Sequence, residues 1–263
     1  MAKGNFTPKD NPYFSKSLEK GLRILALFNE HKTVSTQTEI ARAMNLNMTS
    51  TYRFINTLVC LGYLKKDESS KKLRLGMRAL VQASTHLRAM DFHAAIKSLV
   101  DEVYEKHNIT VDVALVVEDA LSIVYRREAA DTLIYRLPSL SRAWHCTSLG
   151  KAYLAFLPES DRRAIVNSLN LEPRTGKTIV SRKRLWEEIS KTRQRGYAVC
   201  DEEFIPGLIT LGVPLINSEN GQTIGAISFD FSTIQQNVNR MTEQYADLII
   251  KLGQNISDII TVS

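Results

Sequence analysis

The 263-residue sequence lacks the long apolar segments that mark membrane-spanning and secreted proteins. No run approaches the roughly 20 apolar residues that a transmembrane helix needs. The first 14 residues contain no apolar core of a signal peptide. Cysteine is scarce as well. The three cysteines, Cys60, Cys146 and Cys200, are odd in number and far apart. This argues against a disulfide framework and fits a reducing compartment, so we expect a cytoplasmic protein with no membrane partner.

The sequence also lacks the spacings that are typical of a metal site or a catalytic centre. His145, Cys146 and Cys200 do not follow the pattern of zinc ligands, which usually includes close cysteine pairs. We expect buried, reduced cysteines and a hydrogen-bonded histidine. The acidic run at 201–203 is expected to cap a backbone or to pair with Arg or Lys, because no nucleophile, base and orienting group can be placed together. We predict no enzyme activity, no metal and no cofactor.

Positive charge is concentrated in the first third of the chain. Residues 1–90 hold 15 Lys and Arg against 6 Asp and Glu, a net charge of +9, whereas residues 91–263 hold 19 against 22, a net charge of −3. The length favours two domains. A basic first domain and a mildly acidic second one indicate that only the first domain meets a polyanion. A lysine-rich solvated surface is the alternative.

Residues 1–14 predict a loose tail, and residues 16–29 predict a first amphipathic helix. Arg23 is expected to lie away from the buried stripe of this helix, where it is free to contact a phosphate. The expected buried stripe consists of Leu18, Leu22, Leu25 and Phe28.

Residues 36–59 predict two short helices joined by a tight turn. Thr36 and Glu39 form a capping box, and Asn47 is a good N-cap for the second helix. That helix is expected to bury Tyr52, Ile55 and Val59 and to expose polar residues that suit DNA contacts. An ordinary helical hairpin with a polar outer face is the alternative. The side chains expected at the DNA are Thr36, Gln37, Asn47, Thr49, Ser50, Thr51, Arg53, Asn56 and Thr57.

A basic β-hairpin is expected to follow. Leu61-Gly62-Tyr63-Leu64 ends the helix and begins a strand, and Leu73-Arg74-Leu75 alternates as the returning strand. Lys71, Lys72 and Arg74 on this hairpin are placed to contact the flanking DNA backbone. Residues 15–76 therefore predict a winged helix-turn-helix.

Residues 77–90 predict a linker helix, whose apolar stripe packs either on its own domain or on the same helix of a partner subunit. Residues 91–263 then change to the alternation of strands, and they predict an α+β domain with helices around a largely antiparallel sheet. Strands are expected at 111–117, 121–125, 133–137, 197–200, 208–216 and 222–231, and helices at 91–104, 146–157, 159–169, 181–195 and 234–260.

Several motifs, taken in order, resemble the IclR family of bacterial transcription regulators over roughly residues 16–260. In the first domain the resemblance rests on Ser17-Leu18-Glu19-Lys20-Gly21-Leu22, Thr49-Ser50-Thr51-Tyr52-Arg53 and Leu61-Gly62-Tyr63-Leu64. In the second it rests on His145-Cys146-Thr147-Ser148-Leu149-Gly150-Lys151-Ala152, on Gly196-Tyr197, on Asp201-Glu202-Glu203 with Gly207, and on Ala226-Ile227-Ser228. Each motif is weak alone, but their order and spacing are specific.

The resemblance implies an α+β two-domain protein: a winged helix-turn-helix, a linker helix and a GAF-like effector domain that also mediates oligomerisation. It implies a homodimer or dimer of dimers that binds double-stranded operator DNA, commonly at a catabolic operon, in response to an organic acid, aromatic or sugar-derived metabolite. A small-molecule binding protein or enzyme with an incidental basic domain is the alternative. The implied effector pocket is lined by Leu133, Leu137, Trp144, Ser148, Leu149, Cys200, Leu208, Thr210, Ser228 and Asp230.

Two of these positions depart from the family pattern, since position 200 is often acidic and position 230 is often small. Asp230 in an enclosed pocket would repel an organic acid. Three alternatives follow: Asp230 points out of the pocket, it pairs with Arg126 or Arg127, or the ligand carries hydroxyl or amino groups. Ser148, by contrast, lies near a helix N-terminus, where an anionic ligand is favoured.

Overall fold

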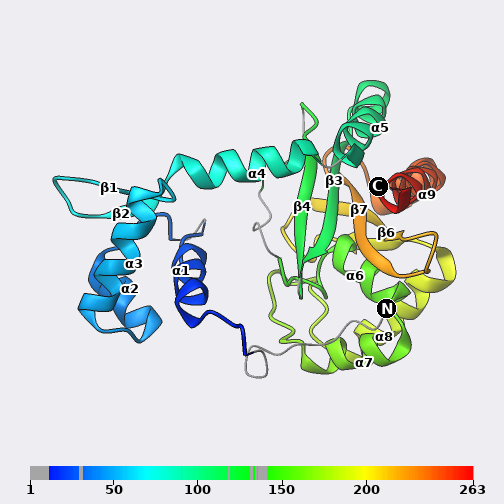
Figure 1. Cartoon of the computed structure of the whole chain (residues 1–263). Coiled ribbons are helices and arrows are strands. Elements are labelled where there is room, and N and C mark those ends of the chain that lie inside the picture. The colour runs from blue at the N-terminus through cyan, green and yellow to red at the C-terminus, as the bar shows by residue number, and fades with distance from the viewer. Residues whose placement is uncertain are drawn as a thin grey trace. The chain divides into compact units, whose positions relative to one another are not determined.

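The structure is a computed structural model that describes residues 12–29, 32–89, 91–117, 119–130, 133, 135 and 141–262. The chain divides into two compact units, Met1–Ala89 and Met90–Ser263 (Figure 1). Most of the expected N-terminal tail, residues 1–11, lies outside the described residues. No helix in the described part of the chain is both long enough and apolar enough to cross a membrane.

The first unit is a small helical core with a two-stranded antiparallel hairpin. Its core is formed by buried aliphatic and aromatic side chains, among them Ile24, Ile40, Ile55 and Leu73. These residues come from separate elements, so the core holds the helices and the hairpin together. The elements are α1 (Lys16–Ala26), α2 (Gln37–Met44), α3 (Met48–Cys60), β1 (Leu64–Lys66), β2 (Leu73–Leu75) and α4 (Met77–Ala89).

The starts of α2 and α3 are held by the caps that the sequence predicts. The Thr36 hydroxyl accepts a hydrogen bond from the Glu39 backbone, and the Glu39 carboxylate accepts one from the Thr36 backbone. Asn45 closes α2 with a left-handed backbone (φ 50°), a conformation that Asn adopts more readily than most residues. The Asn47 side chain accepts a hydrogen bond of 2.8 Å from the Ser50 backbone and begins α3. The capping box and the Asn47 cap are confirmed.

The prediction for α1 was wrong in two respects. The helix ends at Ala26, not at Asn29. Leu18 and Leu22, which were expected in the core, are 64% and 59% exposed, while Ile24 is fully buried. The helix packs on α2 and α3 through the face that carries Ile24, which lies on another side of the helix from Leu18 and Leu22.

The second unit contains a five-stranded sheet in the order β4-β3-β7-β6-β5, and every neighbouring pair is antiparallel. This confirms the predicted largely antiparallel sheet. Its elements are α5 (Asp91–His107), β3 (Thr110–Val117), β4 (Ala120–Arg127), α6 (Ser148–Phe156), α7 (Glu159–Ser168), α8 (Arg182–Arg195), β5 (Ala198–Asp201), β6 (Leu208–Ile216), β7 (Thr223–Ser232) and α9 (Val238–Val262).

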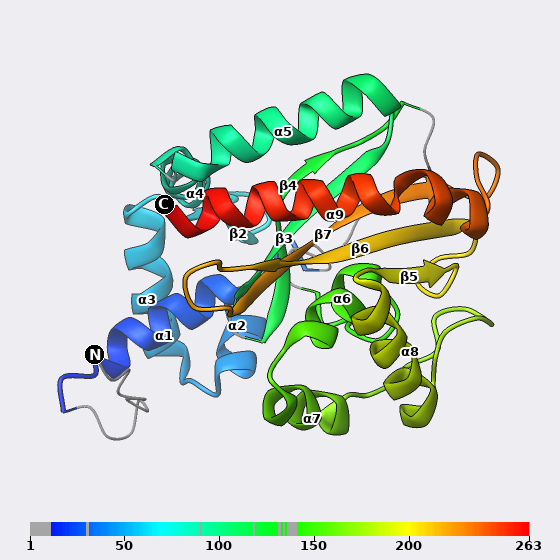
Figure 2. The ribbon, with the colours of Figure 1, turned by 90° about the vertical axis from the view of Figure 1, so that its right-hand side faces the viewer.

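Helices cover both faces of this sheet (Figure 2). One face packs on α5 and α9 through alternating apolar residues of the central strands, such as Leu211 on β6 and Phe229 on β7. The opposite face packs on α6. Because successive side chains of a strand alternate between the faces, residues Thr210, Ser228 and Asp230 point to the α6 side. Polar side chains therefore gather between the sheet and α6.

The expected third strand at 133–137 is wrong at the two positions that the structure describes. Leu133 and Tyr135 belong to no strand, and β4 is the edge of the sheet. Tyr135 is instead buried, with its ring centroid 6.4 Å from that of Phe204. Side-chain contacts therefore replace the strand pairing that the alternating pattern predicted.

Candidate functional site

The first candidate surface is the outward face of α3. Thr49, Arg53, Asn56 and Thr57 are exposed, and Ser50 is half-buried. The Thr57 hydroxyl donates to the Arg53 carbonyl oxygen at 2.9 Å. Arg53 is the only charged residue of the helix. The structure thus brings one guanidinium and several short polar side chains together on one exposed helical face.

Two residues of α3 lie differently from the sequence-based expectation. Thr51, which was placed at the DNA, is fully buried, and its hydroxyl donates to the Asn47 carbonyl oxygen at 2.9 Å. Tyr52, which was placed in the core, is 48% exposed. The buried face is formed by Thr51, Ile55 and Leu58, at helical spacings of four and three. Thr51 therefore does not belong to the candidate DNA surface, and Tyr52 is exposed beside that surface.

The neighbouring residues Thr36, Gln37 and Asn47 serve the geometry of the turn. Thr36 and Asn47 use their side-chain oxygens as caps. The Gln37 amide donates to the Met48 carbonyl oxygen at 3.3 Å and joins the starts of α2 and α3. Arg23 is exposed on α1 and lies 3.5 Å from the Glu19 carboxylate.

The hairpin of β1 and β2 carries the second group of cations. Lys65 pairs with Arg74 across the ladder, and both are exposed, as are Lys71 and Lys72. Its turn is ordered by Asp67, whose carboxylate accepts hydrogen bonds of 2.7 Å from the Ser69 hydroxyl and from the Ser70 backbone and hydroxyl. These bonds, the Ser70 backbone bond above all, lower the pKa of Asp67. The basic hairpin is therefore a structured element.

A second candidate site lies between the sheet and α6. Seven of the ten residues named from the family resemblance converge there, and the cavity between them has a volume of only about 20 Å³, room for about one water molecule. The pocket is thus nearly filled by side chains. Its lining consists of Tyr135, Thr147, Ser148, Leu149, Cys200, Phe204, Leu208, Thr210, Ser228 and Asp230.

Two of the described residues that were expected in this pocket, Trp144 and Leu133, do not line it. Trp144 packs in the core of α6 and α8, with its ring centroid 5.1 Å from that of Tyr153. Leu133 packs beside the pocket in a cluster with Phe204, and Leu137 lies outside the described residues. The Trp144 backbone lies close to α6 at Gly150, because this residue has no side chain to prevent the approach.

Three lining residues were missed. In the sequence Tyr135 lies midway between Leu133 and Leu137, which were expected in the pocket. The alternating pattern at 133–137 could therefore also have indicated Tyr135. Thr147 is the N-cap of α6, where its hydroxyl accepts from the Gly150 backbone at 3.1 Å. Phe204 follows the acidic run in a loop, and no sequence pattern placed it in the pocket.

Asp230 does not point out of the pocket. It is 2% exposed, and its carboxylate accepts hydrogen bonds from the Tyr135 hydroxyl and, at 3.0 Å, from the Ser228 hydroxyl. Arg126 forms ion pairs with Asp112 on the neighbouring strand at 2.5 Å and with Glu128 at 3.0 Å. Asp112 is also fully buried. The hydrogen-bond partners of Asp230 are thus Tyr135 and Ser228, whereas the Arg126 guanidinium pairs with Asp112 and acts on Asp230 through its charge.

This arrangement perturbs both carboxyl groups. Burial, followed by the charge of Asp230, raises the pKa of Asp112 well above its usual value. Burial also raises the pKa of Asp230, although the bonds from Tyr135 and the charge of Arg126 offset part of that effect. Two buried carboxylates so close together cannot both ionise freely. The pocket accordingly presents the oxygen atoms of Asp230, Ser228 and Thr210 as hydrogen-bonding groups.

The sulfur and imidazole groups have structural partners. The Cys200 thiol donates to the Cys146 carbonyl oxygen at 3.0 Å, and burial raises the pKa of Cys146 to about 11 and of Cys200 to about 12. His145 Nε2 lies 3.0 Å from the Glu172 carbonyl oxygen. The expected free, buried Cys146 and Cys200 and the hydrogen-bonded His145 are confirmed. Within the described ranges no group of three His, Cys, Asp or Glu could hold a metal.

The acidic loop forms ion pairs, as predicted. Lys177 contacts Asp201 at 3.1 Å and Glu202 at 2.5 Å, and Glu202 also accepts from the Gly207 backbone at 2.7 Å. Glu203 pairs with Lys151, which is fully buried. The loop at 201–203 is therefore held beside the pocket by ion pairs, to α6 through Lys151 and to the segment before α8 through Lys177.

Comparisons with known proteins agree with this architecture. A family model described as "Bacterial transcriptional regulator IclR C-terminal" matches residues 84–258, and one described as "IclR helix-turn-helix domain" matches residues 17–68. The HTH-type transcriptional regulator XynR of Escherichia coli (strain K12) is 28% identical over 221 residues, which cover 83% of this chain and 86% of the relative.

Two solved structures share the fold. An IclR family transcriptional regulator from Brucella abortus has a TM-score of 0.79 at 21% identity and covers 95% of each chain. An IclR homologue from Microbacterium hydrocarbonoxydans, complexed with 4-hydroxybenzoate, has a TM-score of 0.77 at 20% identity, covering 94% of this chain and 100% of its own. With a C-terminal family model that spans well over half its length and a helix-turn-helix model before it, this chain belongs to the IclR family of DNA-binding bacterial transcriptional regulators.

Proposed function

We propose that this regulator binds a specific operator through the exposed face of α3 and the basic hairpin, and that a small metabolite in the pocket beside α6 changes its DNA affinity. It acts in the cytoplasm on a catabolic operon, as a homodimer or dimer of dimers, without catalytic activity. The observation that carries the DNA-binding part is the single exposed face on which Thr49, Arg53 and Asn56 meet, because such a face suits base and phosphate contacts in the major groove.

The cations are divided between two elements in a way that supports this reading. Arg53 is the only charge on α3, so α3 supplies mainly hydrogen-bonding groups. Lys71, Lys72 and Arg74 on the hairpin supply charge for the phosphate backbone, which gives affinity with little sequence information. Stable binding then requires two or more copies of the chain on one operator.

The test is a titration of the full chain with its own upstream DNA at several salt concentrations. Affinity is expected to fall steeply as salt rises, with a slope of about −0.9 in log K per phosphate neutralised. Binding to random DNA of equal length is expected to be at least about 10³-fold weaker. Equal affinity for the upstream DNA and the random DNA would contradict the proposal of a specific operator.

The chemistry of the pocket supports an effector that donates hydrogen bonds. Asp230, Ser228 and Thr210 offer oxygen atoms, and the two buried carboxyl groups disfavour a further carboxylate. We expect hydroxyl-rich or amino-bearing metabolites to bind better than simple organic acids. Ligand entry requires Tyr135 or another lining side chain to move, because the present cavity is small.

Thermal-shift measurements with matched pairs of compounds test this preference. Sugars, polyols and amines are compared with acids of similar size, first on the wild type and then on Asp230→Ser. The wild type is expected to be stabilised by the donors, and the variant to gain affinity for acids. Stabilisation of the wild type by acids alone, unchanged in the variant, would contradict the assignment.

A further inference from the structure

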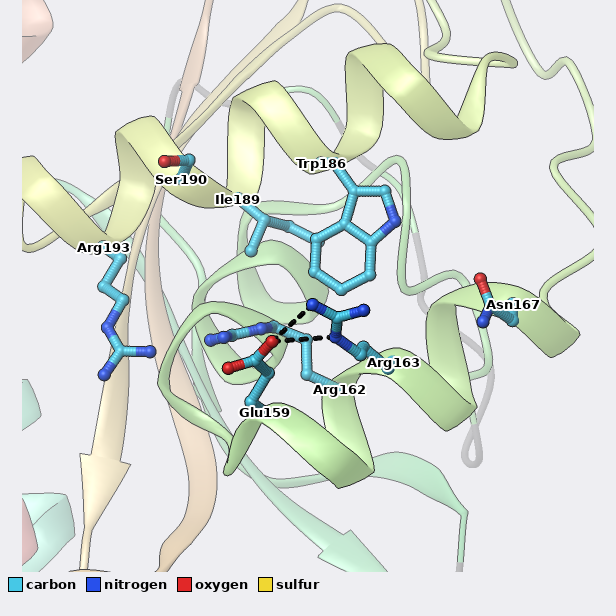
Figure 3. Close-up of a pocket in the computed structure, with 8 residues that line it drawn as sticks. All are labelled: Glu159, Arg162, Arg163, Asn167, Trp186, Ile189, Ser190 and Arg193. Atoms are coloured by element: carbon cyan, nitrogen blue, oxygen red, sulfur yellow. Dashed lines mark hydrogen bonds and ion pairs between the residues drawn. The ribbon is translucent and has the colours of Figure 1, made fainter.

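A second cavity lies on the surface of the effector-domain unit, between α7 and α8 (Figure 3). It has a volume of about 520 Å³, which is within the range of small-molecule sites. It shares no lining residue with the pocket beside α6. We call it the α7–α8 groove, and its lining consists of Glu159, Arg162, Arg163, Asn167, Trp186, Ile189, Ser190 and Arg193.

Helical spacing brings these side chains together. Arg162 and Arg163 follow Glu159 by three and four residues on α7, and Arg193 follows Trp186 by seven on α8, so each set lies on one face of its helix. The Trp186 ring extends from α8 into the groove (Figure 3), and the Arg162 guanidinium carbon lies over this ring, 5.9 Å from its centroid. The groove therefore has three guanidinium groups and one aromatic wall.

Arg162 is the anchor of the groove. The residue is 8% exposed, and its Nη1 donates to the Ala155 carbonyl oxygen at 3.0 Å and to that of Leu157 at 3.4 Å. Its Nε is buried and has no hydrogen-bond partner among the described residues. Burial, and next the positive charge of Arg193, lower the pKa of Arg162. A buried cation held beside a second cation is costly unless an anion compensates it.

The carboxylate in the groove, Glu159, provides that compensation only in part. Glu159 is engaged by Arg163, whose Nε and Nη2 lie 2.8 Å and 2.5 Å from its carboxylate. This pair leaves Arg162 and Arg193 as two positive charges with no second carboxylate in the lining of the groove. Guanidinium groups bind carboxylates and phosphates with charge-assisted hydrogen bonds, often two at a time.

We propose that the α7–α8 groove is a second ligand site of this regulator, for a compact metabolite with two negative charges, a phosphate ester or a dicarboxylate. Arg193 and Arg162 neutralise its charge, Asn167 and Ser190 offer hydrogen bonds at the rim, and Trp186 contacts its carbon skeleton. The site differs in chemistry from the pocket beside α6, whose lining contains the acidic Asp230 and no Lys or Arg. The protein would then bind two kinds of metabolite, an anion in the α7–α8 groove and a hydrogen-bond donor in the pocket beside α6.

The experiment is isothermal titration of the full-length chain with inorganic phosphate, pyrophosphate, succinate and citrate, at an ionic strength held constant with chloride. Saturable binding of at least one of these anions is expected, and a preference for pyrophosphate or for the carboxylates distinguishes the two ligand sources. Arg193→Gln is expected to weaken binding about tenfold, which is the loss of one charge-assisted contact. Arg193 is exposed, so this variant tests the site without disturbing the carbonyl contacts of Arg162.

Two control variants give the result its meaning. Arg184→Gln makes the same charge change at an exposed position of α8 that does not line the groove, and it is expected to bind as the wild type does. Ser148→Ala removes a hydroxyl from the pocket beside α6 without adding volume, and it is likewise expected to leave anion binding intact. Absence of saturable binding for every anion, or equal weakening in Arg193→Gln and Arg184→Gln, would overturn the proposal. Loss of binding in Ser148→Ala, with Arg193→Gln unaffected, would place the anion in the other pocket and overturn the proposal too.

Discussion

At the residue scale, the proposed DNA contact depends most on Arg53, because it is the only charge on α3 and it is exposed. We expect Arg53→Ala to weaken operator binding about 10- to 100-fold, since a base or phosphate contact of this kind is worth about 1–3 kcal/mol. The Tm is expected to change little, because exposed substitutions usually alter stability by less than about 0.5 kcal/mol. Fluorescence anisotropy and a melting curve measure both.

Arg184→Ala provides the control for this variant, since Arg184 is an exposed arginine of α8 in the other unit. It is expected to leave operator affinity unchanged. A large fall in Tm for Arg53→Ala would instead assign Arg53 a structural role.

Asp230 gives a second prediction at this scale, on pH. The folded-state pKa of Asp112 is raised above the unfolded value of about 3.9, so its contribution to stability is present at low pH and is lost as pH rises through the folded pKa. Asp230→Asn removes one of the causes of that shift. The Tm of the variant relative to the wild type is expected to increase from pH 5 to pH 8.

Differential scanning calorimetry across this pH range measures the difference. Asp247→Asn, at an exposed position of α9, makes the same charge change and is expected to give a difference that does not depend on pH. A flat curve for Asp230→Asn would show that the two buried carboxyl groups do not interact as described.

At the scale of elements, the N-cap of α3 links stability to DNA binding. The Asn47 side chain satisfies the Ser50 backbone N–H, and loss of an N-cap costs about 0.5–2 kcal/mol. We expect Asn47→Ala to fray the first turn of α3 and to weaken operator binding, while Asn47→Ser, which keeps an acceptor, preserves both. Hydrogen exchange of the α3 amides in the full chain reports the fraying, and equal protection in the two variants would refute it.

At the scale of the whole molecule, α4 has an apolar stripe without a place in the core of its own unit. Met77, Leu80 and Val81 are 70%, 58% and 51% exposed, at spacings of three and four residues. We therefore favour the second of the two arrangements considered for this helix, in which it packs on a partner subunit. Leu80→Lys with Val81→Lys is expected to shift the protein toward monomers and to reduce operator affinity.

Sedimentation velocity at several protein concentrations measures this shift. The double substitution at Thr85 and Gln82, both to Lys, is a matched control on the same helix, because it adds the same charge without removing apolar surface. An unchanged oligomeric state in Leu80→Lys with Val81→Lys would exclude α4 as the proposed contact.

Local features of the fold were predictable from sequence because their causes are local. The capping box at Thr36, the cap at Asn47 and the β6 strand at 208–216 follow from side chains that bond or alternate within a few residues. The buried face of α1 was not predictable, because its helix carries apolar residues on more than one side. Only packing against α2 and α3 selected the side that holds Ile24.

The sequence by itself thus determined the two-part charge distribution, the helix-turn-helix with its basic hairpin, and most of the residues that meet beside α6. The tertiary structure decided what those residues do together. Asp112 and Asp230 come from strands far apart in the chain, and the sheet register makes them neighbours. Arg162 and Arg193 face one groove only because α7 and α8 pack side by side. Charge interactions depend on distance and burial, and only the folded chain sets these.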